Sequence, residues 1–357
     1  MTAGRQVFGS PQFVHYRHMG ISLLGRRLPA LLIALAAVFA LVTPAASVAA
    51  PADTVAAAAA VEPAVVQITT KIDYQQAIGT GTGTVIDPGG VVLTNYHVVA
   101  GANTVTGTVG GRDYPADLVG YDRTHDIAVL QLRGAGGLPT APIGDSGQVV
   151  VGESTVGLGN ARGVGAPLTH ETGPVTALNR TVNAEDSLTG SSEEVNGLIE
   201  VAADVRPGDS GGPLVNSAGQ VIGVVTAATV TFQMGPGGKG FAIPINDAMA
   251  VAGQIRSGAP SPTVHIGQPV LLGVGVGTQP RREAGIIVRD VMRGGPADQA
   301  GIAIGDIITV LDGTSLDSAT TLTYVLDRHY PGDVVDLTWV DRSGQQRSGK
   351  AALVSGP

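Results

Sequence analysis

Short apolar runs recur along the chain after about residue 60, and each alternates with polar residues or is bounded by glycine and proline. This pattern is typical of β-strands and turns rather than of long helices. Val65–Lys71 alternates, and Thr84–Ile86 and Val91–Leu93 flank a turn at residues 87–90, which predicts a hairpin. Further strands are expected at Val105–Val109, Asp117–Tyr121, Ile127–Leu132, Val149–Leu158, Val175–Leu178, Leu198–Val201, Pro213–Asn216 and Val221–Ala227. The chain is therefore predicted to be mainly β.

Helical spacing is confined to short segments. A helix is expected over Asp247–Ser257, with Ala248, Val251, Ala252 and Ile255 on one face. The Gly/Pro/Ser-rich stretch after it predicts a linker over residues 257–267. Beyond the linker, strand pieces alternate with two short helices, one of which begins at Pro296 and ends at Gly301. The polar stretch from Asn179 to Asn196 has little to bury and predicts a mobile surface loop.

The N-terminus has the layout of a secretory signal peptide. Arg26 and Arg27 precede an uncharged run from Leu28 to Val42, and small residues follow up to Ala50. We expect cleavage after Ala49 and an exported protein, secreted or associated with the cell envelope. An uncleaved membrane anchor is the alternative, because the charge-free sequence is just long enough to span a bilayer.

Composition narrows the classes of function. With 43% apolar and 14% charged residues, the 357-residue chain can build sizeable cores and is not disordered. Its net charge of −8 makes nucleic acid an unexpected partner, because phosphate binding needs a basic face. The chain has no cysteine, which excludes disulfides and zinc thiolates.

The most informative stretch is Arg206–Leu214, where Ser210 lies among glycines and prolines. A serine nucleophile needs a base, an exposed position and backbone N–H donors for the oxyanion. Gly208 and Gly211 allow a sharp turn that brings the amides of Gly208 and Ser210 towards a substrate carbonyl. A plain glycine-rich β-turn would look the same, so the catalytic partners must decide.

The order of those partners along the chain discriminates between two hydrolase folds. In α/β-hydrolases, whose G-x-S-x-G elbow also fits here, the acid and the histidine follow the serine. After Ser210 the only histidines are His265 and His329, whereas His97 and Asp126 lie upstream, each where an apolar strand meets a loop. The order His97, Asp126, Ser210 is that of the chymotrypsin-like triad.

Three neighbouring residues compete for these roles. Asp117 and Asp122 are alternatives to Asp126, and His125 is an alternative to His97. We prefer Asp126 because an apolar strand follows it directly and would bury the carboxylate where it can orient an imidazole. His125 is expected to be a solvent-exposed residue at the end of a loop.

Four segments in this order, ahead of a PDZ-like tail, resemble the HtrA (DegP-like) serine proteases. They are Thr94–Val99, Asp126–Leu132, Gly208–Leu214 and Gly240–Pro244, and the resemblance covers nearly everything after about residue 60. It implies two six-stranded antiparallel β-barrels followed by a small α+β PDZ domain. It also implies an endopeptidase in which Ser210 attacks, His97 is the general base and then acid, and Asp126 orients His97. The Gly208 and Ser210 amides would stabilise the oxyanion, with no metal or cofactor.

Residues expected to bind substrate near the scissile bond are Asp204, Thr226, Ala227 and Gly240. Many HtrA relatives carry a small residue where this chain has Asp204, six positions before the serine. In trypsin-like enzymes an aspartate at this spacing selects arginine or lysine. If Arg206 or Lys239 neutralises Asp204, selection of small aliphatic residues is the alternative.

The tail from residue 268 to 355 resembles one PDZ domain. Leu271, Leu272, Gly273 and Val274 match the loop whose amides grip a peptide's C-terminal carboxylate, and a peptide would add as an extra strand. Leu322 and Leu326 are expected to line the groove. Many bacterial relatives have an aromatic residue in place of Leu271.

The predicted organisation is a signal peptide over residues 1–50, a flexible lead-in or short helix against the first barrel over 51–61, a protease domain over 62–256, the linker, and the PDZ domain. Expected partners are unfolded or exported proteins and peptide C-termini, with a role in protein quality control or processing. The resemblance allows a trimer. A catalytically silent peptide-binding scaffold and an α/β esterase are the rival functions.

Overall fold

The computed structural model describes residues 52–73, 76–185, 192–226, 238–277 and 285–357. The expected signal peptide and Ala227 lie outside the described residues. Within the described part, no helix is both long and apolar enough to cross a membrane.

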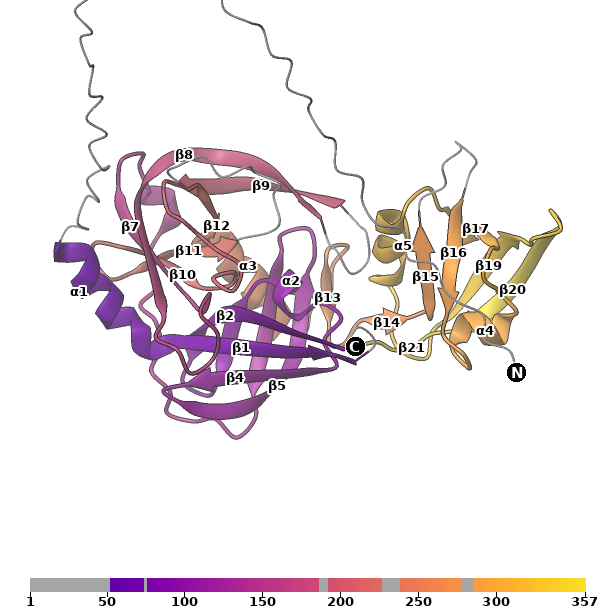
Figure 1. Ribbon diagram of the computed structural model, residues 1–357, viewed down its shortest axis with the longest axis horizontal. Coiled ribbons are helices and arrows are strands. Elements are labelled where there is room, and N and C mark those ends of the chain that lie inside the picture. The colour runs from indigo at the N-terminus through magenta and orange to yellow at the C-terminus, as the bar shows by residue number, and fades with distance from the viewer. Residues whose placement is uncertain (1–51, 74–75, 186–191, 227–237, 278–284) are drawn as a thin grey trace, which may run out of the picture. The chain divides into compact units, whose positions relative to one another are not determined.

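The first barrel follows the predicted strands closely (Figure 1). Its strands are β1 (Val65–Ile72), β2 (Ala77–Asp87), β3 (Val91–Thr94), β4 (Thr104–Val109), β5 (Arg112–Asp122) and β6 (Ile127–Leu132). They pair antiparallel in the order β5-β4-β1-β2-β3-β6, and β6 pairs back onto β5 to close the ring. Alternate apolar side chains such as Ile68, Leu93 and Leu130 fill the interior and are fully buried.

A second closed barrel has the strand order β10-β11-β12-β9-β8-β7. Its strands are β7 (Ser154–Gly159), β8 (Thr169–Glu185), β9 (Ser192–Val201), β10 (Pro213–Asn216), β11 (Val221–Thr226) and β12 (Gly240–Pro244). Val201, Leu214 and Ile222 lie in its core. The prediction of a mainly β chain with two six-stranded barrels is confirmed.

Two local predictions in this barrel are wrong. The described part of the polar stretch from Asn179 to Asn196, predicted as a loop, extends β8 and β9, which stay paired out to Glu185 opposite Ser192. Residues 186–191 of that prediction lie outside the described residues. Val182 and Val195 are buried and paired across this hairpin, so they anchor a ribbon whose other positions are mostly polar. The strand predicted from Val149 begins only at Ser154, after a 3-10 turn.

The N-terminal segment of the described chain is a helix and not a flexible lead-in. It comprises α1 (Ala52–Val61) and the 3-10 turn η1 (Glu62–Ala64). Ala57, Ala58 and Val61 are buried, and α1 packs on β7 and β10. The contact is therefore with the second barrel, and the expectation that such a helix would lie on the first barrel is wrong.

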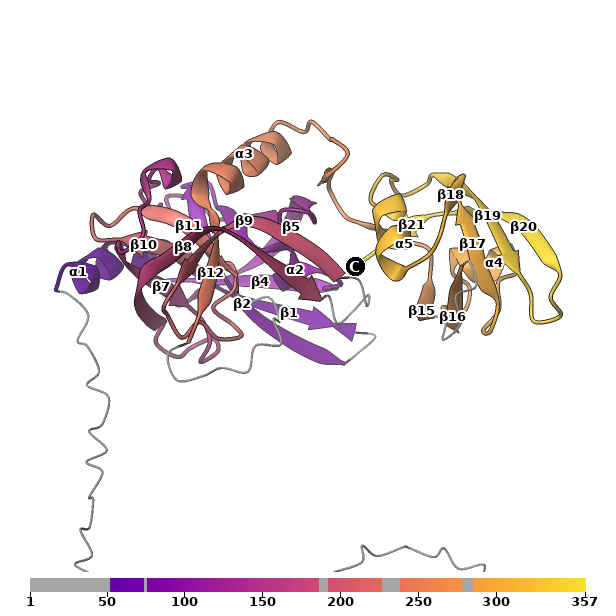
Figure 2. The ribbon, with the colours of Figure 1, turned by 90° about the horizontal axis from the view of Figure 1, so that it is seen from above.

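The predicted C-terminal helix of the protease domain is α3 (Ile245–Arg256), and it contacts strands of both barrels (Figure 2). The expected face is buried at Ala248, Val251, Ala252 and Ile255. Part of the segment expected as a linker is a strand, β13 (Val264–Ile266), which pairs antiparallel with β5. The first barrel is thus extended by one edge strand.

The PDZ domain has its own core around Val288, Ile308 and Trp339. Its sheet runs β15-β16-β17-β19-β20, with β18 beside β17, and a separate pair joins β14 to β21. The strands are β14 (Val270–Leu271), β15 (Val274–Gly277), β16 (Ile286–Val291), β17 (Ile307–Leu311), β18 (Thr314–Ser315), β19 (Val334–Val340), β20 (Gln346–Ala352) and β21 (Val354–Ser355). The two helices are α4 (Pro296–Ala300) and α5 (Ala319–Leu326), at the predicted positions.

Candidate active site

The first barrel brings His97 and Asp126 together. His97 lies on α2 (Tyr96–Val99), one turn of helix after β3, and Asp126 directly precedes β6, the strand paired with β3. The His97 Nδ1 atom is 2.8 Å from Asp126 Oδ2, and the His97 backbone amide donates to Oδ1 at 3.0 Å. Two bonds to one carboxylate fix both the ring and the backbone of His97, and the acceptor at Nδ1 keeps the proton there and leaves Nε2 as the basic nitrogen.

Asp126 itself is held in an unusual backbone conformation. Its φ is +52°, in the left-handed region that L-residues rarely adopt. The Asp126 carbonyl accepts from the Tyr96 amide at 3.2 Å and from Asn95 Nδ2 at 2.9 Å. Thr226 Oγ1 donates to Asp126 Oδ2 at 3.3 Å from the second barrel. Thr226 is 4% exposed, and its expected contact with substrate stays a prediction.

The competing residues are engaged elsewhere. His125 Nδ1 lies 2.8 Å from Asp122 Oδ2, and this hydrogen bond raises the pKa of His125 although burial opposes it. Arg133 binds Asp117 with two nitrogens, and this hydrogen bond lowers the pKa of Asp117. Of Asp117, Asp122 and Asp126, it is thus Asp126 whose carboxylate is hydrogen-bonded to His97.

The turn that carries Ser210 joins β9 to β10 and packs against the first barrel. Gly208 and Gly211 have φ of +102° and +85°. A Cβ at Gly211 would lie 2.1 Å from the Thr82 carbonyl oxygen and 3.1 Å from the Asn95 amide nitrogen, two residues before His97. The Thr82 amide in turn donates to the Ser210 carbonyl at 2.8 Å. Ser210 is 3% exposed, so the expectation of an exposed serine is wrong because this contact encloses the turn.

Asp209 also stabilises the serine turn, a role that was not predicted from the sequence. Its carboxylate accepts from the Arg206 amide at 3.0 Å, from the Ala161 amide at 3.1 Å and from the Thr169 hydroxyl. Asp209 is 3% exposed, and three donors compensate its burial. The Gly208 carbonyl accepts from Thr82 Oγ1 at 2.7 Å, which turns the Gly208 carbonyl inward. The position of Asp209 next to Ser210 could have indicated a supporting role. Its partners Ala161 and Thr169, however, lie 48 and 40 residues away in the sequence.

Asp204 has an internal cation. Arg206 Nε lies 3.0 Å from Asp204 Oδ2, and both side chains are about half exposed, at 58% and 46%. Lys239, the other candidate, lies 3.2 Å from Glu200 Oε1. Gly238 borders Asp204, because a Cβ there would lie 2.9 Å from the Asp204 Cα. The negative charge of Asp204, which a basic substrate side chain would need as its partner, is therefore already paired with Arg206.

Gly240 packs against the loop before Ser210. A Cβ at Gly240 would lie 2.4 Å from Val205 Cγ2 and 3.1 Å from Val201 Cγ2. Because Gly240 has no side chain, strand β12 can pack directly against Val205 in the loop that follows Asp204. Gly240 leaves no open space towards Val205.

The predicted peptide loop of the PDZ domain lies between β14 and β15. Gly273 has φ of +81°, and the carbonyls of Leu272 and Gly273 accept from the amides of Ala297 and Met292. Leu272 is buried in the PDZ core, whereas Leu271 and Val274 are half-buried. Of the two helix residues, Leu322 is 6% exposed and belongs to the core, while Leu326 is half-buried.

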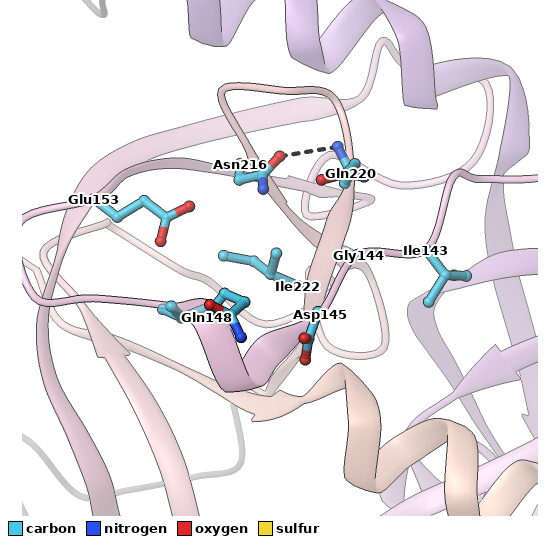
Figure 3. A pocket seen from close by; sticks show the side chains of 9 residues that line it. Ile143, Gly144, Asp145, Gln148, Glu153, Asn216, Gln220 and Ile222 are labelled. Atoms are coloured by element: carbon cyan, nitrogen blue, oxygen red, sulfur yellow. Dashed lines mark hydrogen bonds between the residues drawn. The ribbon is translucent and has the colours of Figure 1, made fainter.

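A pocket of about 340 Å³ opens elsewhere on the second barrel (Figure 3). Its lining includes Asp145, Gln148, Glu153, Asn216 and Gln220, and none of the predicted site residues. Asn216 Oδ1 accepts from the Gln220 amide at 3.0 Å and so serves the hairpin turn. Within the described ranges, no group of three or more His, Asp or Glu residues could hold a metal ion.

Comparison with known proteins agrees with this architecture. The model of the trypsin-like peptidase domain matches residues 81–224, and that of the PDZ domain matches residues 270–352. The chain is 30% identical over 296 residues to the serine protease Do-like HtrA of Lactococcus lactis, covering 79% of this chain and 72% of the relative. The chain belongs to the HtrA family of serine proteases. The resemblance stated from the four segments is thereby confirmed.

Two further HtrA-type proteins are similar to this chain. One is named probable periplasmic serine endoprotease DegP-like, from Halomonas elongata, with 34% identity over 272 residues, 75% of this chain and 55% of the relative. The other is a solved structure titled HtrA-type protease AlgW with tripeptide, with 29% identity, a TM-score of 0.50, and coverage of 86% of this chain and 98% of that chain. The chain spans 55–65% of the length of the curated relatives that share 33–35% identity with it.

The contact between β7 and the serine turn of this HtrA-family chain predicts a sensitive position. A Cβ at Gly159 would lie 2.1 Å from Asp209 Oδ1 and 2.6 Å from Asp209 Cα. Gly159→Ala should lower the free energy of unfolding by about 2 kcal/mol, and displacement of the turn should lower peptidase activity roughly 100-fold. Denaturant unfolding and fluorogenic peptide hydrolysis measure the two effects.

Gly157→Ala in the same strand is the matched control. A Cβ there would meet Val225 Cγ2 at 3.4 Å, an ordinary contact, so stability and activity should stay near the original values. Equal activity of the two variants would show that the close approach of Gly159 to Asp209 does not hold the serine turn.

Proposed function

We propose that this protein is an endopeptidase that cleaves proteins through a His97-Asp126-Ser210 triad. The observation that carries the proposal is the double hydrogen bond between His97 and Asp126, whose loop adjoins the turn bearing Ser210. The chemistry of such a site is acyl transfer to serine.

The reaction follows from these roles. His97 Nε2 takes the Ser210 proton as Oγ attacks the scissile carbonyl, and the oxyanion forms against the Gly208 and Ser210 amides. His97 then gives the proton to the leaving amine, and the carbon–nitrogen bond breaks to leave an acyl-enzyme. Water, deprotonated by His97, hydrolyses the ester and regenerates Ser210. Asp126 keeps the correct tautomer and stabilises the imidazolium throughout.

Replacement of the triad residues tests this proposal. Ser210→Ala should lower kcat by roughly 10⁴-fold or more and abolish labelling by a fluorophosphonate probe, and His97→Ala should be nearly as severe. The double variant should lose little more, because the residues act as one unit. Steady-state kinetics with a fluorogenic peptide and circular dichroism give both activity and fold.

Two results would contradict the triad. Peptide cleavage above a few per cent in Ser210→Ala would mean that another residue is the nucleophile. A folded original protein that neither cleaves nor labels would favour the scaffold function instead.

We propose that the site selects small aliphatic residues before the cut. Arg206 neutralises Asp204, so the carboxylate that would select arginine or lysine is already paired. An arginine side chain would have to displace Arg206 from that carboxylate. The sequence-based hypothesis of basic specificity loses its support for this reason.

Arg206→Ala should uncover a latent basic preference. In this variant kcat/KM for substrates with arginine before the cut should rise roughly 10-fold relative to valine. Adding Asp204→Ala should cancel the gain, and Arg162→Ala, which removes a different nearby arginine, should leave the profile unchanged. Peptide-library profiling of all four proteins provides the comparison. An arginine preference of the original protein that disappears in Asp204→Ala would refute the neutralised carboxylate.

We propose that the PDZ domain binds the C-termini of protein substrates. Gly273 has a left-handed φ, and the carbonyls of Leu272 and Gly273 accept from the amides of Ala297 and Met292, so these two carbonyls are directed into the domain. The neighbouring strand β15 is an edge strand of its sheet, so a peptide can add to it.

Calorimetry on the full chain carrying Ser210→Ala tests the carboxylate mechanism without cleavage. A peptide with an apolar C-terminal residue should bind at least roughly 10-fold more tightly as the free acid than as the amide, because only the acid presents an anion to the loop amides. Equal affinities of the two forms would exclude recognition of the carboxylate.

We also propose that the protein acts outside the cytoplasm in protein quality control or processing. The apolar run after Arg26 and Arg27, with small residues behind it, supports export. The name of the Halomonas elongata relative points to the same compartment for that protein.

A further inference from the structure

A buried arginine in the turn that carries Asp126 contacts the segment that carries His97. Arg123 is in the turn from β5 to β6, and its side chain is 7% exposed. Its Nη2 donates to the Tyr96 hydroxyl at 2.9 Å, and the guanidinium lies 4.6 Å from the Tyr96 ring centre. Tyr96 is the residue before His97. A fully charged guanidinium at this depth needs an anionic partner.

The anion is Asp327, the residue at the C-terminal end of α5 in the PDZ domain. Arg123 Nε donates to Asp327 Oδ2 at 2.8 Å, and Nη2 lies 3.4 Å from Oδ1. Tyr121 donates its hydroxyl to Asp327 Oδ1 at 2.7 Å. Burial acts to lower the pKa of Arg123, but Tyr96 and Asp327 outweigh it and hold this pKa well above its ordinary value.

A series of stacked rings connects Tyr96 to the residues around Asp327. Tyr96 stacks on Tyr121 with ring centres 4.3 Å apart, and Tyr121 stacks on His265 at 5.1 Å. His265 stacks on Tyr330 at 4.6 Å, and its Nδ1 lies 2.9 Å from the Asp327 carbonyl. The column of rings therefore runs from the residue beside His97 to the chain around Asp327.

The backbone of Arg123 is tied to the catalytic aspartate as well. The Asp126 amide donates to the Arg123 carbonyl at 3.1 Å, and the Tyr96 amide donates to the Asp126 carbonyl at 3.2 Å. Arg123 thus contacts Asp126 through its backbone and Tyr96 through its side chain. Its position sets the separation of the segments that carry Asp126 and His97, while Asp126 holds a left-handed φ that its surroundings must enforce.

We propose that Asp327 is a positioning residue for proteolysis, and that it acts from the PDZ domain through Arg123 on the His97–Asp126 pair. This inference rests on the proposed function of the triad. Loss of the Asp327 charge leaves Arg123 buried beside a neutral amide, and the turn that carries Asp126 relaxes. The PDZ domain then has a catalytic contribution that is independent of peptide capture.

The test is Asp327→Asn in the full chain with a four-residue fluorogenic substrate that has no free carboxylate. Such a substrate reports the triad and not peptide capture by the PDZ domain. We expect kcat to fall roughly 10- to 100-fold, because misplacement of a catalytic pair acts on the chemical step. We expect KM to stay within about twofold, because Asp327 does not contact substrate. The rate of fluorophosphonate labelling should fall in parallel, while its end-point stays at one label per folded chain.

Two comparisons separate positioning from general damage. Asp336→Asn removes an exposed PDZ carboxylate that pairs with Lys350, and it should leave kcat unchanged. In an Arg123→Met background, Asp327→Asn should have no further effect on kcat, because the carboxylate acts only through the guanidinium. Fluorescence of Trp339, in the PDZ core, verifies that each variant is folded.

If Asp327→Asn does not fold, the variant Tyr121→Phe tests the same role of Asp327. It keeps the stacked ring and removes only the hydroxyl donor to Asp327, so kcat should fall roughly 3- to 10-fold. An active original protein with unchanged kcat in the folded variants would overturn the role of Asp327. An original protein that neither cleaves nor labels would instead refute the triad itself.

Discussion

The arrangement of the site depends on one constrained residue, Asp126. Its carboxylate receives the ring and the amide of His97 and the hydroxyl of Thr226, while its carbonyl receives Tyr96 and Asn95. These contacts come from Asn95 just before α2, from α2 itself and from β11, so they tie both barrels to one residue. Together they sustain the left-handed backbone, which would otherwise cost of order 1–3 kcal/mol.

The second barrel meets this centre mostly through backbone. Thr82 of β2 donates its amide to the Ser210 carbonyl and its hydroxyl to the Gly208 carbonyl. Asp209 braces the turn from the other side with donors from residues 161, 169 and 206. The position of Ser210 is therefore set by Thr82 and Asp209, which have no role in the proposed chemistry.

Local patterns allowed the two barrels, the PDZ domain and the His97–Asp126 pairing to be predicted, because each depends on strand periodicity, turn residues or motif order. The β8–β9 extension was missed since the buried residues described in this two-stranded ribbon, Val182 and Val195, stand isolated among mostly polar neighbours in the sequence. The helix α1 was left open because alanine repeats show no apolar stripe. Such elements are defined by what they pack against, and that is not visible in a local window.

The supporting network was missed for a related reason. Asp209, Thr226 and Arg123 are each adjacent to a motif, yet their partners lie up to about 200 residues away in the sequence. The Asp204 carboxylate shows the opposite case, since its partner is two residues away. There the sequence offered both candidate cations, and only geometry could choose Arg206 over Lys239.

The seam around the serine turn also has an evolutionary consequence. At Gly159, Gly211 and Gly212, the space for a Cβ is already taken by backbone atoms of the opposing segment. A chain in this condition cannot vary these sites one methyl group at a time, because every replacement pushes whole strands apart. Two of these close approaches, at Gly159 and Gly212, lie within the second barrel, and the third, at Gly211, faces Thr82 of the first barrel. Sequence change in such a protein is therefore accommodated more readily in exposed loops than at these three glycines.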